Sequence, residues 1–379
     1  MFGGLGQLVA ALGSRSVDVY EWEQADIRRA RLPNGPRWSK LAKMHPRLHF
    51  TGWQLAHAVV KADFLVERNL LLPGLGFLFQ VDQILDFGSS PDLRTVPGAA
   101  VTLNDFTRTS LSGRIGQGLS MLFAHSKGYT FVGHLASDPA VSSHLASLGK
   151  PTKVADFLFE TKTMERMILE SKGSFSQVDN DPTDIKRVLK VALTGQIDYW
   201  MSRVTPNASQ GYAVYTCLRE TGSGTPSALV FVDPAGQDTI GPVELPEDWA
   251  RRRNYAAWVT FMGFPDTARS LRGTQIRDGV AVDLPVFRIG DRDIAVSSVL
   301  GHAPKGKWVG AGLEVRALEA IGAAVSSDDR QLMNYAGDFA DGIGSAGLPE
   351  ANGSIFPDGS WFGEIDGNTP FRGFAAFRL

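Results

Sequence analysis

Two acidic residues and a lysine interrupt the apolar run near the middle of the chain. Residues 154–175 read VADFLFETKTMERMILESKGSF, which predicts two strands joined by a polar turn. Asp156 lies in the first strand, and Glu170 and Lys172 lie in the second. Because side chains alternate between the faces of a strand, Glu170 and Lys172 should share one face while Ser171 points to the other. A hairpin would bring Asp156 alongside Glu170.

Buried charged groups are costly unless they pair with each other or hold an ion. Two carboxylates on neighbouring strands suit Mg²⁺ or Mn²⁺, hard cations that prefer oxygen ligands. A lysine two residues beyond one ligand could orient or deprotonate a metal-bound water, which is the arrangement for metal-assisted phosphodiester hydrolysis. The spacing fits equally well a buried Glu170–Lys172 ion pair with Asp156 capping a turn, so the residues alone leave both interpretations open.

The elements that would position these residues are predicted from the spacing of apolar residues. Residues 113–129 predict a helix, and residues 130–136 predict a strand after it. Gly116 lies inside that helix, where glycine costs helix propensity, so we expect the helix to pack closely against the sheet or a substrate. Downstream, residues 181–201 predict a second helix that begins at an Asp-Pro pair, and residues 211–218 predict a last strand.

The pattern of Asp156, thirteen intervening residues and then Glu170-Ser171-Lys172 resembles the PD-(D/E)XK, or restriction-endonuclease-like, nuclease superfamily. The predicted order helix-strand-strand-strand-helix-strand is similar to the core of that superfamily, and the resemblance covers about residues 105–235. It implies an α/β (α+β) fold, in which helices flank a mixed sheet. It also implies metal-dependent hydrolysis of nucleic acid, with DNA as the expected substrate.

The resemblance implies a role for each residue of the motif. Asp156 and Glu170 would ligate Mg²⁺ or Mn²⁺, and the carbonyl of Ser171 would be a further ligand. Lys172 would orient the attacking water and stabilise developing charge. Many members carry a glutamate on the first core helix as an additional ligand, whereas this chain has Gln117 near that position. This difference favours one essential ion and makes Gln117 an accessory ligand.

Two other interpretations compete with catalysis. A nuclease-like fold without activity would serve as a nucleic-acid-binding or assembly module, and Gln117 in place of a carboxylate favours it. A purely structural interpretation has Glu170 and Lys172 merely paired. In the second predicted helix, Gln196 and Tyr199 are similar to the glutamine–tyrosine pair of the RecB-like branch of the superfamily, although their spacing is not the usual one.

Length and charge set limits on these interpretations. A chain of 379 residues predicts two or three domains, which we place at residues 1–104, 105–235 and 236–379. The middle region would be the nuclease-like core, and the last would be an accessory region. The N-terminal region has no motif, but residues 51–69 predict a helix that Thr51 can cap, and residues 91–97 look like a linker. A net charge of −2 means that any nucleic acid must meet a local basic face. The candidates for that face, each of which also fits an ordinary helix surface or core, are Lys186, Arg187, Lys190, Arg251, Arg252 and Arg253.

The sequence also bears on location. The single cysteine, Cys217, excludes intrachain disulfides and a cysteine zinc cage. The first residues lack a basic n-region, so no signal peptide is expected. The longest apolar stretch, residues 70–81, is too short to cross a bilayer. We therefore expect a cytoplasmic protein without membrane contact, with a homodimer among its expected states.

Overall fold

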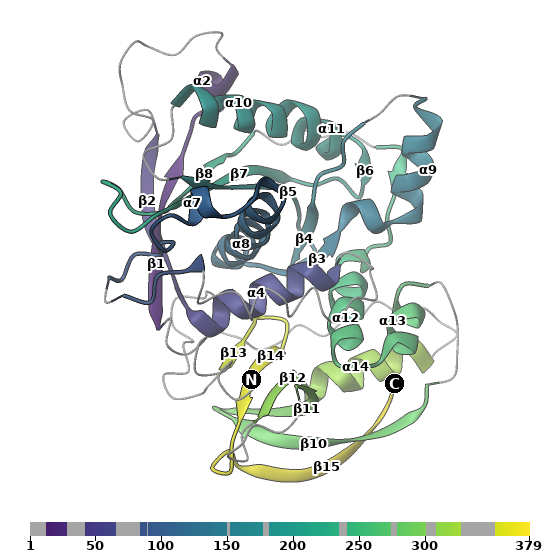
Figure 1. Cartoon of the computed structure of the whole chain (residues 1–379). Helices are drawn as coiled ribbons and strands as arrows, with labels where there is room; N and C mark the ends of the chain where they lie inside the picture. The colour runs from purple at the N-terminus through teal and green to yellow at the C-terminus, as the bar shows by residue number, and fades with distance from the viewer. Residues whose placement is uncertain are drawn as a thin grey trace.

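A computed structural model of the chain contains two large β-sheets with helices between them and outside them (Figure 1). The larger sheet has the strand order β2-β1-β8-β7-β5-β4-β3 and mixes parallel with antiparallel neighbours. The smaller sheet has the order β13-β14-β12-β11-β10-β15 and is antiparallel. The structure describes residues 13–28, 42–65, 84–88, 90–149, 152–176, 182–234, 241–273, 279–300, 308–326 and 353–379.

The strands form where apolar and β-branched residues run together or alternate with polar ones. Those of the larger sheet are β1 (Ser14–Glu21), β2 (Lys43–Thr51), β3 (Tyr129–His134), β4 (Phe157–Thr161), β5 (Arg166–Ser176), β7 (Gln210–Arg219) and β8 (Ala228–Val232). Those of the smaller sheet are β10 (Ala281–Ile289), β11 (Arg292–Leu300), β12 (Trp308–Glu314), β13 (Gly353–Ile355), β14 (Ser360–Ile365) and β15 (Phe371–Arg378). A separate parallel pair is formed by β6 (Val204–Thr205) and β9 (Val243–Glu244).

The helices build layers around these sheets. Two helices lie between the sheets, α4 (Gly52–Leu65) and α8 (Asp105–Ser126), and α10 (Pro182–Ala192) and α11 (Asp198–Met201) cover the opposite face of the larger sheet (Figure 1). The remaining helices are α2 (Gln24–Arg28), α7 (Ala99–Thr102), α9 (Pro139–Ser147), α12 (Trp249–Phe261), α13 (Pro265–Leu271) and α14 (Val315–Ser326). The fold is therefore a mixed α/β fold with a curled mixed sheet flanked by helices.

The predicted hairpin is present. Strands β4 and β5 pair antiparallel from Phe157 opposite Leu169 to Glu160 opposite Arg166. Met164 has a φ of 68° in the turn between them, the left-handed conformation that closes short connections. The neighbour of β5 on its other side is β7, which runs parallel to it after the crossover through α10 and α11.

Helix α8 begins at Asp105, before the predicted start at residue 113. The Asn104 side chain caps it by accepting a hydrogen bond from the Thr107 N–H at 2.8 Å. Because the first turns of the helix carry mostly polar residues, the apolar spacing there does not reveal them. The prediction of the start was therefore wrong by two turns, while the element itself is present.

Glycines let α8 rest directly on β5. A Cβ added to Gly116 would lie 3.3 Å from the Cα of Gly173, and one added to Gly173 would lie 2.1 Å from the Ser112 carbonyl oxygen. The latter distance is shorter than any real contact of a Cβ atom, so a side chain at Gly173 would push the helix away. The expectation that Gly116 marks close packing against the sheet is confirmed, and this packing fixes α8 beside residues 171–173.

Residues ahead of the predicted core also belong to the larger sheet. β1 pairs with β8, and β2 pairs with β1 at the edge. Residues 91–97, which the sequence suggested as a linker, are instead held against the sheet, since the Leu93 N–H donates to the Ser16 carbonyl and the Thr95 N–H to the Arg219 carbonyl, both at 2.9 Å. The prediction of a linker was wrong, because two side chains within this turn-rich stretch, those of Leu93 and Thr95, are buried.

Helix α4 is buried on nearly all sides, because it packs between α8 and the smaller sheet. The predicted cap is confirmed, because the Thr51 Oγ1 accepts from the Gln54 N–H at 3.2 Å and the Gln54 Oε1 accepts from the Thr51 N–H at 2.8 Å. In the described part of the chain, no helix combines the length and the apolar character that crossing a membrane requires.

A buried charged pair ties α4 to the smaller sheet. Lys61 donates to the Asp358 carboxylate, and both side chains have an exposed fraction of 0%. Asp358 also accepts from the Ser360 hydroxyl at 2.6 Å and from the Asn254 amide at 2.5 Å. These partners satisfy the buried charge and hold the turn before β14 against α4 and α12.

Candidate functional site

Asp156 and Glu170 lie together where β4 ends beside β5. Since β4 begins at Phe157, the residues of β5 beyond Leu169 have no strand partner on that side. Asp156 takes this place: its N–H donates to Glu170 Oε2 at 3.0 Å, and its Oδ2 accepts from the Ser171 N–H at 2.9 Å. Each carboxylate is thus held by the backbone of the other residue or its neighbour, which gives the pair a fixed geometry.

Lys172 and Ser171 point to opposite faces of β5, as the alternation of a strand predicts. The Lys172 ammonium donates to Glu170 Oε1, and the lysine side chain is 38% exposed while that of Glu170 is fully buried. The Ser171 hydroxyl lies 2.9 Å from the Ser120 hydroxyl of α8 on the other face. The structure therefore brings Asp156, Glu170 and Lys172 into one group, in which Glu170 is fully buried, Asp156 is half-buried and Lys172 is partly exposed.

Burial raises the pKa of both carboxyl groups. For Asp156, loss of solvent and then the charge of Glu170 raise the pKa to about 7, against the opposing effects of the Ser171 N–H and Lys172. For Glu170, loss of solvent raises the pKa although the Lys172 ammonium pulls it down. The metal-free pair therefore tends to keep a proton near neutral pH, which a bound cation would replace.

Gln117 lies on α8, next in the chain to a residue that packs on β5. It follows Gly116, which packs on Gly173, and precedes by one turn Ser120, which contacts Ser171. The Gln117 side chain is half-buried. The structure thus places Gln117 on the helix that packs on the strand of the motif, and its side-chain amide cannot supply a carboxylate ligand.

Gln196 joins the group although it was not among the predicted site residues. It lies in a π-helical turn, Leu193–Ile197, between α10 and α11, and its Nε2 donates to the Val154 carbonyl at 2.8 Å. A hydrogen bond from Gln196 also acts on the Glu170 carboxyl and opposes the rise of its pKa. Tyr199, the other residue of the pair noted in the sequence, lies 3.0 Å from His144 instead.

The donor set fits a cation that needs few protein ligands. Within the described ranges, no group of three His, Cys, Asp or Glu side chains is placed to hold a metal ion. Two carboxylates are available, and the Ser171 carbonyl points to the same edge as the Ser171 N–H that Asp156 binds. Mg²⁺ is commonly held by one or two carboxylates and keeps several waters, whereas a catalytic zinc usually needs three protein ligands. The residues therefore fit Mg²⁺ or Mn²⁺ better than zinc.

The predicted arginine contacts to phosphate are wrong. The side chains of Arg251 and Arg253 are 5% and 7% exposed, and that of Arg252 is 13% exposed. Ion pairs inside the protein hold them: Arg251 with Glu160, Arg252 with Asp248, and Arg253 with Asp138. The arginines belong to α12, which packs against β3 and β4, and their charges compensate buried carboxylates.

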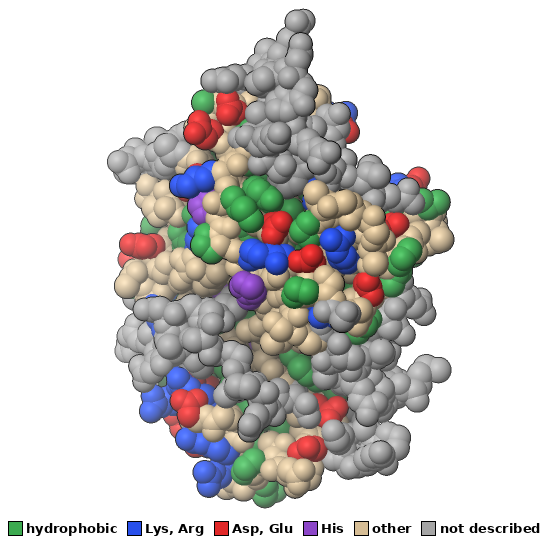
Figure 2. Space-filling model, turned by 90° about the vertical axis from the view of Figure 1, so that its left-hand side faces the viewer, with side chains coloured by type: hydrophobic (Ala, Val, Ile, Leu, Met, Phe, Trp, Pro, Cys, Tyr) green, Lys and Arg blue, Asp and Glu red, His purple; other side chains and the backbone are tan. Residues whose placement is uncertain are grey.

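The basic residues of α10 separate into two groups. Lys186 is buried, with 7% of the residue exposed, so its predicted contact with phosphate is wrong as well. Arg187 is 74% exposed beside Asp184, and Lys190 is exposed. Figure 2 shows one face of the molecule, on which basic and acidic side chains are interleaved. Arg187 and Lys190 remain candidates for phosphate contacts on that helix.

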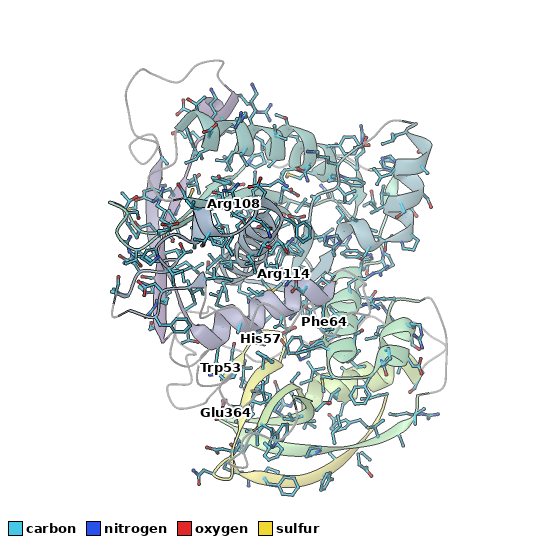
Figure 3. All side chains as sticks on the ribbon, in the orientation of Figure 1. Trp53, His57, Phe64, Arg108, Arg114 and Glu364 are labelled. Carbon is cyan, nitrogen blue, oxygen red and sulfur yellow. The ribbon has the colours of Figure 1, made fainter. Side chains whose placement is uncertain are left out.

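A serine, a histidine and an aspartate also meet inside the protein. The Ser360 hydroxyl lies 3.1 Å from His57 Nε2 and donates to Asp358 at 2.6 Å, and Figure 3 shows His57 on α4, on the side of that helix nearer the smaller sheet. All three side chains are buried completely, so no substrate reaches them. Burial lowers the pKa of His57 well below its usual value, which keeps the ring neutral. This group is a structural network.

Comparisons of the chain with protein-family models, with curated proteins and with solved structures found no match. Function is therefore inferred here from the residues and their geometry.

Proposed function

We propose that the chain is a metal-dependent nuclease that hydrolyses phosphodiester bonds of nucleic acid, with DNA as the expected substrate. The observation that carries this proposal is the interlocked pair Asp156 and Glu170 at the open end of β4, with the Lys172 ammonium on Glu170. Two buried carboxylates with raised pKa values are unfavourable by themselves, and a cation between them would compensate that cost.

The order of elements supports a restriction-endonuclease-like core. Along the chain, α8, β3, β4, β5, α10 and β7 follow one another, with α9 inserted between β3 and β4 and with α11 and β6 inserted between α10 and β7. The first three strands form an antiparallel meander, and β7 lies parallel to β5. Helices α8 and α10 lie on opposite faces of the sheet (Figure 1). This order supports the proposed core, in which Asp156 would lie just before its second strand and Glu170 in its third.

Each residue of the group has a role in this proposal. Asp156 and Glu170 would hold one divalent ion, with the Ser171 carbonyl as a further oxygen and Gln117 as an accessory group. The ion would supply positive charge and lower the pKa of a bound water. Lys172, whose side chain is 38% exposed, would hydrogen-bond to the attacking water or to a phosphate oxygen. Its present bond to Glu170 keeps the ammonium within reach of that position.

Cleavage assays with two variants and a matched control test the proposal. Plasmid, linear duplex, single-stranded DNA and RNA would each be incubated with the protein in Mg²⁺ and in EDTA. We expect Mg²⁺-dependent cleavage of at least one substrate, reduced at least about 100-fold in Asp156→Asn and in Glu170→Gln. Asp233→Asn is the control, because Asp233 also has a raised pKa beside another acid but lies at the end of β8. Cleavage by both variants at the wild-type rate would refute the proposal.

A nuclease-like module without catalysis is the second candidate. The observation that favours it is the absence of a third acidic ligand in the described residues, where Gln117 stands on α8. Calorimetry with Mn²⁺ separates the two candidates. If millimolar Mn²⁺ binds to the wild-type protein but not to Asp156→Asn, the nuclease is supported. If Mn²⁺ does not bind, or binds equally well to both proteins, the inactive module is supported.

A further inference from the structure

The smaller sheet carries a row of aromatic side chains on the face turned away from α14. The row, called the aromatic strip below, consists of Trp308 on β12, Phe287 on β10, and Phe371 and Phe374 on β15. Successive ring centroids are 5.9, 5.5 and 5.5 Å apart, and each pair is tilted or edge-on. Phe371 is 53% exposed and Phe374 is 71% exposed. Phe287 and Trp308 are half-buried, so the rings that face solvent are those of Phe371 and Phe374. Two large exposed rings in contact are unusual, because burying them would be favourable.

Strand β15 is also an edge of the sheet, and its charged residues are all arginines. Arg372 lies between the two phenylalanines, and Arg378 lies on the same face as Phe374, four residues along the strand. Both arginines are exposed. The acidic residue nearest in register on the neighbouring strand is Asp283, opposite Ala376. At the lower left of Figure 2, basic side chains gather around a few acidic ones.

We propose that the aromatic strip binds single-stranded nucleic acid. Bases would stack on Phe371 and Phe374, and the guanidinium groups of Arg372 and Arg378 would contact the phosphates. Aromatic platforms framed by basic residues bind single strands in this way, because every base has a face that can stack. From Phe374 to Arg378 the strand advances about 13 Å, which matches roughly two nucleotides of an extended strand. The surface would bind whether or not Asp156 and Glu170 cleave.

A second copy of the chain fits this surface less well. Two β15 edges that paired antiparallel about Ala375 would bring Arg372 of one copy near Arg378 of the other, although Arg372 lies at a register shift of the strand. Like charges directly opposite each other on paired strands are destabilising. A polyanion meets the same two arginines favourably, and the charge of the surface therefore selects nucleic acid as the occupant.

Fluorescence anisotropy with a labelled oligothymidylate of about ten nucleotides tests this, with the full chain and with EDTA present so that no cleavage occurs. We expect Phe374→Ala to weaken binding about tenfold and the double variant Phe371→Ala/Phe374→Ala about a hundredfold. Phe106→Ala is the matched control, because Phe106 is 85% exposed but lies on α8, and its affinity should equal that of wild type.

Charge variants test the phosphate contacts separately. Arg372→Gln and Arg378→Gln should each reduce the slope of log affinity against log salt by about 0.7, the value for one contact on a single strand. Asp283→Asn should strengthen binding, because it removes the negative charge beside Ala376. All of these side chains are exposed, so circular dichroism should show an unchanged fold.

Three results would overturn the proposal: no binding of the oligonucleotide by wild type, equal losses in Phe106→Ala and Phe374→Ala, or phenylalanine variants that change the oligomeric state but not the affinity for the oligonucleotide. The last result would identify the strip as a contact between copies. Because the binding assay needs no metal, its failure is independent of whether the carboxylate pair supports cleavage.

Discussion

Metal binding at the carboxylate pair should release protons in an amount that depends on pH. Burial and Glu170 raise the pKa of Asp156 to about 7 in the metal-free protein. A group with a pKa of about 7 carries roughly half a proton at pH 7 and about nine-tenths of a proton at pH 6. A cation held by Asp156 must displace that proton. We therefore expect a release of about 0.5 proton per ion at pH 7 and about 0.9 at pH 6.

The same coupling between proton release and metal binding determines how the affinity for Mn²⁺ changes with pH. Below pH 7, the affinity for Mn²⁺ should fall towards tenfold for each pH unit, and above pH 8 it should level off. In the metal-free protein, the contribution of Asp156 to stability changes with pH in the direction opposite to that of an ordinary ion-paired aspartate. The folded pKa of Asp156 lies above its unfolded value, so the folded state binds more protons between about pH 4 and pH 7. This contribution to the free energy of unfolding should fall as pH rises through that window.

Isothermal titration calorimetry in pairs of buffers with different ionisation enthalpies measures the released protons directly. Titrations of Mn²⁺ at pH 6, 7 and 8 should give a smaller release as the pH rises. Asp156→Asn should remove both the release and most of the binding, while Asp233→Asn should change neither by much. A proton count near zero at pH 6, or an affinity that stays constant from pH 6 to pH 8, would refute this account of the pair.

Two further predictions concern stability and are measured by urea unfolding. Gly173→Ala should lower the free energy of unfolding by about 1–3 kcal/mol or more, because its Cβ would meet the Ser112 carbonyl. The control Gly113→Ala on α8 has open space around the new Cβ, so it should be neutral or stabilise the fold by up to about 1 kcal/mol. Similar values for the two variants would contradict the close packing of α8 on β5. Lys61→Met should cost about 3–5 kcal/mol, because it leaves the Asp358 carboxylate buried without its cation, and a cost below about 1 kcal/mol would show that the pair contributes little.

Local patterns in the sequence predicted the elements that carry the site. The strands around Asp156 and Glu170 follow from apolar runs interrupted by a polar turn, and the alternation of β5 places Ser171 away from Lys172 as expected. The Thr51 cap marks the start of α4. Each of these features depends on residues close together in the chain, where spacing and capping act directly.

Features that depend on distant partners were not predictable in this way. The run of arginines in α12 looked like a basic surface, but Arg251 is buried against Glu160, which lies 91 residues away in the sequence. Lys61 meets Asp358 across 297 residues, and nothing local to either indicates the other. Gln196 gave only a weak signal, since its place beside Glu170 depends on the π-helical turn that interrupts the helix.

The rate of cleavage by Lys172→Met tests the central claim most directly. Lys172 is partly exposed and, in the proposed mechanism, would act on water or phosphate rather than bind the ion. Single-turnover cleavage in saturating Mg²⁺ should be slower than wild type by about 100- to 1,000-fold, while Mn²⁺ binding measured by calorimetry is retained. A wild-type cleavage rate in this variant, or the absence of any Mg²⁺-dependent cleavage by the wild-type protein, would contradict the assignment of the group as a nuclease site.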